Sequence, residues 1–119
     1  MNDNFLTEKI FTGENVQRAA IARIEWIFET FPSVCLSCSG GKDSTVLFHL
    51  VADVARRKKR RFSVLFIDWE AQYQCTIEHI QKMRNMYGDV TETFYWVALP
   101  LTTVNGVSQF QPERFFHCV

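Results

Sequence analysis

Residues 39–44, with the sequence SGGKDS, combine the side chains and the backbone properties that bind a phosphate group. They follow a short apolar run and precede a segment with helical spacing, which predicts a loop between a strand and a helix. Gly40 and Gly41 let a ligand approach the main chain, and a helix that starts here presents unpaired N–H groups. Lys42 adds a positive charge, and the flanking serines add hydroxyl groups. The predicted ligand is a phosphate or a pyrophosphate.

Asp43 is the residue of this loop whose charge opposes an anion. Two roles would reconcile it with the prediction: its side chain caps the helix, or it holds a Mg²⁺ ion that accompanies a nucleotide. The alternative for the whole stretch is a strand-to-helix turn without a ligand. Other phosphate loops fit less well, because a Walker loop needs Gly where Leu36 lies and Ser or Thr where Asp43 lies. The three spaced glycines of a dinucleotide-binding loop are also absent.

The segments around the loop must form the elements that position it. Apolar residues at steps of three and four predict three amphipathic helices, and short apolar runs predict three strands. The alternation favours an α/β fold, a three-layer, Rossmann-like α/β/α arrangement with a parallel sheet and right-handed crossovers. The loop then lies at the carboxyl end of a strand, where open α/β sheets bind ligands. The predicted helices are residues 12–31, 44–57 and 74–88, and the predicted strands are residues 33–37, 61–68 and 93–100.

Three local details of this prediction can be checked directly in a structure. Thr12 or Asn15 is expected to cap the first helix. Residues from Leu101 onward are expected to be mostly loop, with one short strand at residues 107–110. The second helix is expected to bury the stripe formed by Val46, Leu47, Leu50, Val51 and Val54.

The composition of the 119 residues predicts one domain, residues 1–119, with 47% hydrophobic and 22% charged residues. No apolar run is long enough to cross a membrane, so no membrane partner is expected. The polar first ten residues lack the features of a secretion signal. Four irregularly spaced cysteines are expected to be reduced thiols, and together these observations indicate a cytoplasmic protein.

Six consecutive cations, Arg56 to Arg61, are the one marked concentration of charge. They would suit a nucleic-acid backbone. The alternative is a solvated end of a helix, where cations interact favourably with the helix dipole. The net charge is zero, so the sequence favours this alternative, and nucleic acid is a less favoured partner.

The pattern SxSGGKDS, residues 37–44, resembles the pyrophosphate loop of the adenine-nucleotide alpha-hydrolase-like superfamily. The lysine form, followed by TVLFHL, most resembles the phosphoadenosine phosphosulfate reductase branch. Within that branch, residues 66–80 and 94–113 look like the reductase-related proteins described as co-activators of prophage gene expression. The resemblance covers about residues 14–113.

This resemblance implies that the chain binds ATP or phosphoadenosine phosphosulfate on a parallel sheet. Asp68, at the end of the second predicted strand, would contact ribose, adenine or a metal ion, and its alternative role is a helix-entry cap. Trp69 and Tyr73 are candidates for stacking on the base, and the alternative for both is the hydrophobic core. The residues that would line the phosphate site are Ser37, Ser39, Gly40, Gly41, Lys42, Asp43 and Ser44.

The sequence departs from the reductases in its cysteines. Their nucleophile lies in a C-terminal Glu-Cys-Gly type of motif, which is absent here, and Cys118 after His117 does not replace it. Cys35 and Cys38 are three residues apart on a strand and are expected to face opposite sides. His49 and His79 have no ligand-like spacing, so neither zinc nor an iron–sulfur cluster is expected. The alternative function is therefore a non-catalytic regulatory protein that keeps the loop and acts through a protein or DNA partner.

The predicted number of strands is also smaller than in the family, so the chain is expected to be a truncated member. Its first strand would then be an edge of the sheet with unpaired backbone groups. Such edges are usually covered. The expected cover is the C-terminal tail, a second copy in a homodimer or another protein.

Overall fold

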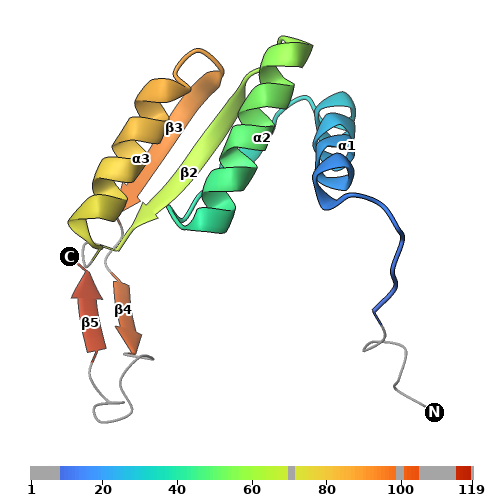
Figure 1. The fold of residues 1–119 in the computed structure, drawn as a ribbon. Coiled ribbons are helices and arrows are strands. Elements are labelled where there is room, and N and C mark those ends of the chain that lie inside the picture. Colours follow the sequence, from blue (N-terminus) through green and yellow to red (C-terminus); the bar gives the residue numbers. More distant parts are fainter. Residues whose placement is uncertain (1–8, 70–71, 99–100, 105–114, 119) are drawn as a thin grey trace.

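A computed structural model describes residues 9–69, 72–98, 101–104 and 115–118. Helices and strands alternate over the first six elements, which confirms the predicted order (Figure 1). The helices are α1 (Val16–Thr30), α2 (Lys42–Lys58) and α3 (Gln74–Met86), and the strands are β1 (Cys35–Ser37), β2 (Phe62–Asp68), β3 (Thr91–Ala98), β4 (Leu101–Val104) and β5 (Phe115–Cys118).

The first three strands form one parallel sheet in the order β1-β2-β3. Its register aligns Leu36 with Val64, and Val64 with Phe94. The predicted α/β fold with a parallel sheet is therefore confirmed. Among the described residues β1 pairs only with β2, so it forms an edge of the sheet, as the sequence predicts.

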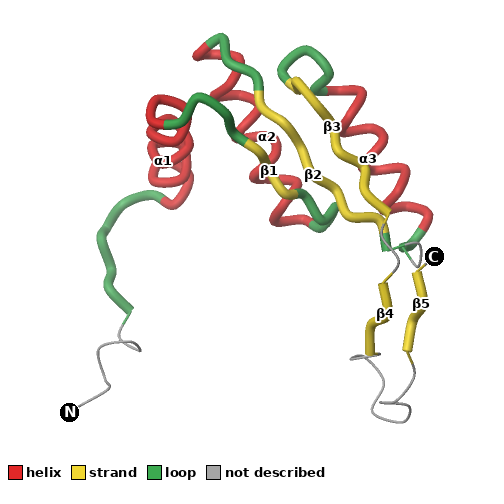
Figure 2. The backbone as a smooth tube through the Cα atoms, turned by 180° about the vertical axis from the view of Figure 1, so that it is seen from behind, coloured by secondary structure: helices red, strands yellow, loops and turns green. Residues whose placement is uncertain are grey.

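α2 and α3 lie against one face of this sheet, and α1 lies beside α2, beyond the β1 edge (Figures 1 and 2). The Phe62 ring of β2 lies edge-on to Phe48 of α2 at 5.9 Å between ring centroids and to Phe28 of α1 at 6.4 Å. Side chains of the opposite face, such as Ile67 and Tyr95, are exposed. Because side chains of a strand alternate between faces, the described residues supply one helical layer and the sheet of the predicted three layers.

The start and end of α1 follow from local sequence. Asn15 is its N-cap, because its side-chain oxygen accepts hydrogen bonds from the backbone N–H groups of Gln17 at 2.9 Å and Arg18 at 3.4 Å. Asn15, and not Thr12, is therefore the cap. Pro32 follows the last turn and excludes a helical conformation for the residue before it.

The buried stripe of α2 differs from the predicted one. Val51 and Val54 are buried as expected, but Val46 and Leu47 are exposed. Phe48 takes their place, with its ring between Phe62 and Tyr87. The face of α2 that carries the large Phe48 ring is therefore the one that packs into the core.

The basic run holds α2 against α1. Arg57 pairs with Glu25 at 3.0 Å, and Lys58 pairs with Glu29 at 2.7 Å. The guanidinium group of Arg60 donates to the last carbonyl groups around the end of α1, those of Phe28, Phe31 and Pro32 at 2.6–3.0 Å. Three of the six cations lie in the last turn of α2, as the helix-end alternative expects. Most of these cations therefore bond to other groups of the same protein. Nucleic-acid binding by the basic run stays an untested prediction.

The loop predicted after Leu101 is wrong in part. β4 and β5 form a separate antiparallel pair, in which Leu101 is opposite Cys118 and Thr102 is opposite His117. Backbone pairing between distant segments carries no local sequence signal, which is why it was not expected. The described part of the tail pairs with itself and not with β1. The predicted strand at residues 107–110 lies outside the described residues.

None of the described helices is long and apolar enough to cross a membrane.

Candidate functional site

The SGGKDS loop lies at the carboxyl end of β1, as the sequence predicts. Beyond the strand, the backbone N–H of Cys38 still bonds to the carbonyl of Leu65 at 2.9 Å, and α2 begins four residues later at Lys42. Gly41 is the N-cap residue and has no side chain with which to cap the helix. The N–H groups of the first turn have no acceptor inside the helix. The positive end of the α2 dipole therefore opens at the loop.

Gly40 shapes this loop for two separate reasons. Its φ of +83° lies in the left-handed region that side chains disfavour. A Cβ atom at this position would lie 2.9 Å from Cγ2 of Thr76 and 3.3 Å from Cδ1 of Ile80, both on α3. The loop backbone is thus packed directly against α3. Gly41 differs, since its φ is −76° and its added Cβ would meet only Ser39 Oγ, at 3.5 Å.

Two serine hydroxyl groups form hydrogen bonds within the loop. Ser39 Oγ and Ser44 Oγ are 3.1 Å apart and share a hydrogen bond. Ser44 Oγ also donates to the carbonyl of Gly41 at 3.1 Å, and the N–H of Gly41 donates to Ser39 Oγ at 3.4 Å. These contacts tie both ends of the turn to each other.

Lys42 and Asp43 lie on the outside of the first helical turn. Both side chains are 91% exposed, and Lys42 Nζ is 3.3 Å from Asp43 Oδ1. The predicted cap by Asp43 is wrong, because α2 begins two residues earlier than expected and places Asp43 within the first turn. There its charge interacts favourably with the helix dipole. The predicted Mg²⁺ role of Asp43 is not tested by these contacts.

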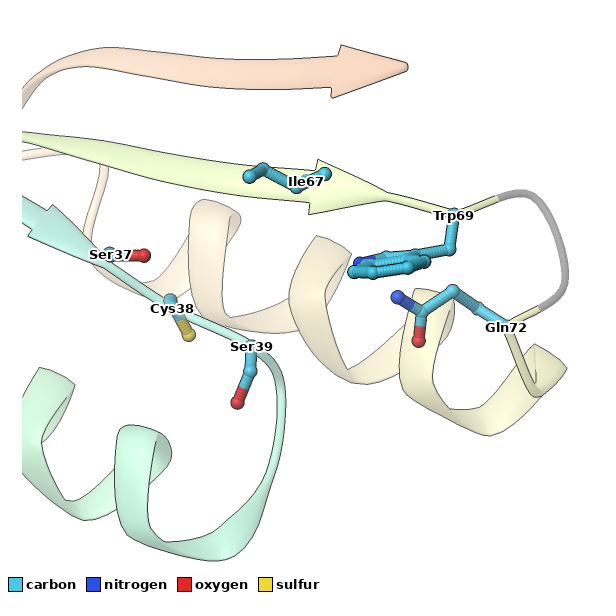
Figure 3. A pocket seen from close by; sticks show the side chains of 6 residues that line it. All are labelled: Ser37, Cys38, Ser39, Ile67, Trp69 and Gln72. Atoms are coloured by element: carbon cyan, nitrogen blue, oxygen red, sulfur yellow. The ribbon is translucent and has the colours of Figure 1, made fainter. Parts of the chain in front are cut away.

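A pocket of about 160 Å³ opens beside the loop, between the ends of β1 and β2 (Figure 3). Figure 3 shows the indole of Trp69, just after β2, and the side chain of Gln72, just before α3, pointing toward the end of β1. Trp69 is 42% exposed, so its core alternative is wrong. The pocket is lined by Ser37, Cys38, Ser39, Ile67, Trp69 and Gln72.

Asp68 and Tyr73 are not among the residues that line this pocket. Asp68 Oδ2 accepts a hydrogen bond from the indole N–H of Trp96 at 3.0 Å. The N-cap residue of α3 is Tyr73, five residues further on, so the helix-entry cap predicted for Asp68 is wrong. Tyr73 is 82% exposed, which also contradicts its core alternative. The structure thus brings Trp69, but not Tyr73, to the pocket.

The cysteines and histidines take different positions. Cys35 is exposed and Cys38 is buried, which confirms that they face opposite sides of the strand. His49 bonds through Nδ1 to the hydroxyl of Tyr87. Within the described part of the chain no three metal-ligating side chains gather. His79 lies 2.8 Å from the hydroxyl of Thr45, directly beside the loop.

Sequence reasoning missed five residues of this region, namely Cys38, Thr45, Ile67, Gln72 and His79. Thr45 carried a local signal, because it is four residues after Gly41 and reaches the carbonyl of that residue. His79 carried none, since it is 34 residues from Thr45 and meets it only when α3 packs beside α2.

The fold and the site define a parallel α/β protein with a glycine-rich loop between its first strand and the following helix. The chain belongs to the phosphoadenosine phosphosulfate reductase domain family, which matches residues 33–102. This confirms the predicted branch. The comparisons do not address the likeness to prophage co-activators.

Two relatives show how much of the family the chain represents. It is 57% identical over 99 residues to the uncharacterized protein YbdN of Escherichia coli (strain K12), covering 83% of this chain and 24% of the relative. It is 31% identical over 78 residues to the adenosine 5'-phosphosulfate reductase of Bacillus cereus (strain Q1), covering 65% of this chain and 32% of the relative. The chain therefore spans a third or less of these relatives. No solved structure gave a significant match.

Proposed function

We propose that the chain binds the phosphate groups of an adenine nucleotide, ATP or phosphoadenosine phosphosulfate, at residues 39–44. The observation that carries the proposal is the uncapped N-terminus of α2, which opens where the left-handed Gly40 ends the turn after β1. Backbone N–H groups and the helix dipole suit an anion at this position. Membership of a family named for a phosphosulfate substrate supports the same class of ligand.

The pocket beside the loop suits the adenosine part of such a ligand. Trp69 offers an aromatic face, and Gln72 offers an amide that can donate and accept hydrogen bonds. Ser37 and Ser39 line the same pocket and connect it to the phosphate loop.

Three charged residues complete the proposed nucleotide site. Lys42, exposed at the mouth of the loop, would neutralise the phosphates. Asp43 would hold a Mg²⁺ ion that accompanies the nucleotide, and Asp68 would contact ribose, adenine or that ion.

A second candidate is a non-catalytic regulatory protein of the prophage co-activator type, acting through a protein or DNA partner. The burial of Cys38 favours it, because this thiol lines the pocket but is only 3% exposed. A nucleophilic thiol must reach the reacting atom, and a side chain enclosed to this degree offers little access to it. In this candidate function the protein still binds the nucleotide but does not catalyse the reduction.

Titration calorimetry with ATP, AMP and phosphoadenosine phosphosulfate, with and without Mg²⁺, tests the proposal. Replacing Lys42→Ala removes one charge-assisted contact, so we expect about 10- to 100-fold weaker binding of the phosphate-rich ligands. Lys82→Ala, on the exposed side of α3, is the matched control and should bind like the wild type. No binding of any of the three ligands would contradict the proposal. Conversion of ATP to AMP would exclude the non-catalytic candidate.

A further inference from the structure

A chain of three hydrogen-bonding groups connects α3 to the phosphate loop. Nε2 of His79 lies 2.8 Å from Oγ1 of Thr45. Oγ1 of Thr45 in turn donates to the carbonyl oxygen of Gly41 at 2.7 Å. Thr45 and His79 are both half-buried, so water competes less for these bonds than at an open surface.

The direction of these bonds follows from the groups involved. The carbonyl of Gly41 can only accept, so the single hydroxyl proton of Thr45 points to it. Oγ1 then accepts from His79, and this order requires the tautomer of His79 that carries its proton on Nε2. The order of donation is therefore His79 to Thr45 to Gly41.

The hydrogen-bond chain affects the ligand site through the carbonyl group of Gly41. It also accepts from the backbone N–H of Thr45 at 3.0 Å and from Ser44 Oγ at 3.1 Å. A trans peptide unit is planar, so its N–H points opposite to its carbonyl. Fixing the carbonyl of Gly41 therefore aims the N–H of Lys42 outward, along the start of α2, where an anion would bind.

We propose that His79 is a positioning residue of the phosphate loop, which orients the Gly41–Lys42 peptide through the hydroxyl of Thr45. This inference rests on the proposed nucleotide-binding function and assigns a role within that site. α3 then supports the loop at two points, since Thr76 and Ile80 also lie against Gly40. His79 does not touch the ligand and acts only through Thr45.

The test compares substitutions that remove the bond with one that keeps it. His79→Leu removes the donor, and Thr45→Val removes the hydroxyl while keeping the shape of the side chain. His79→Gln keeps an N–H donor at the same number of bonds from Cα. His49→Leu is the matched control, because His49 is also on a helix of this layer but bonds to Tyr87.

The readout is calorimetric affinity for ATP with Mg²⁺ and for phosphoadenosine phosphosulfate. Loss of one oriented hydrogen bond predicts about 3- to 10-fold weaker binding for His79→Leu and for Thr45→Val. The double variant should bind no more weakly than either single variant, because both break the same chain. His79→Gln should return to within about twofold of the wild type, and His49→Leu should equal the wild type.

Two results would overturn the role of His79: wild-type affinity in His79→Leu, or additive losses in the double variant without rescue by Gln. If the wild type binds neither ligand, the proposed function fails first. The ¹⁵N resonances of the histidine ring then decide the inference separately. A proton on Nε2 of His79 supports the hydrogen-bond chain, and a proton on Nδ1 alone contradicts it.

Discussion

Replacing Gly40→Ala should destabilise the protein for two reasons that can be separated by experiment. The left-handed φ of +83° costs a side-chain-bearing residue about 1–2 kcal/mol. The new methyl group would lie 2.9 Å from Cγ2 of Thr76, and relieving such overpacking costs about 1–3 kcal/mol more. We therefore expect a loss of about 2–5 kcal/mol in the free energy of unfolding, a large part of the stability of a small domain.

Thr76→Ser separates the two contributions because it removes only the clashing methyl group. The double variant Gly40→Ala with Thr76→Ser should recover part of the overpacking cost of about 1–3 kcal/mol, because Cδ1 of Ile80 still lies 3.3 Å from the new Cβ, and should keep the backbone cost. Gly41→Ala is the matched control, since its φ of −76° is allowed and its Cβ would meet no atom closer than 3.5 Å. It should change stability by less than about 1 kcal/mol.

Urea unfolding followed by circular dichroism measures all four proteins, and calorimetry with ATP measures the loop itself. Gly40→Ala should also weaken nucleotide binding, because the turn that opens the start of α2 is distorted. Stability of Gly40→Ala within about 0.5 kcal/mol of the wild type would refute the assigned geometry. Equal losses in Gly40→Ala and in the double variant would refute the contact with Thr76.

Two further predictions concern the pairing of elements. The hydrogen bonds that Arg56 donates to Asp89 at 2.8 Å lower the pKa of that carboxyl group. The unfolded chain therefore binds the proton more readily, so the stabilising effect of this pair is present above about pH 4 and is lost as the pH falls further. The stability difference between wild type and Asp89→Asn should shrink from pH 6 to pH 3 in urea titrations, and a difference that grows would contradict the pair. A homodimer is expected from the exposed edge strand β1 and from the uncovered sheet face around Tyr95. Light scattering should detect this dimer, and Tyr95→Asp should weaken it. A strict monomer at high concentration would exclude it.

Local patterns were sufficient for the order of elements and for the position of the loop. Spacing of apolar residues is a property of neighbours in sequence, so α1, α2, α3 and the three parallel strands could be predicted within a few residues. Two adjacent glycines before a helix start predicted the turn, and Asn15 before an apolar periodic segment predicted a cap. The limits of this reasoning appear at Asp43, where a shift of two residues in the helix start changed the expected role.

The sequence by itself determined the fold class, the position of the glycine-rich loop and the branch of proteins that the chain resembles. Tertiary packing alone decided that Phe48 belongs to the buried face of α2, that Arg60 binds the end of α1, and that Trp69 faces a pocket. It also decided that α3 supports the loop through Thr76 and His79. The physical reason is the same in each case. These contacts join residues 14 or more positions apart or shape a surface between strands, and nothing in a local pattern encodes such pairs.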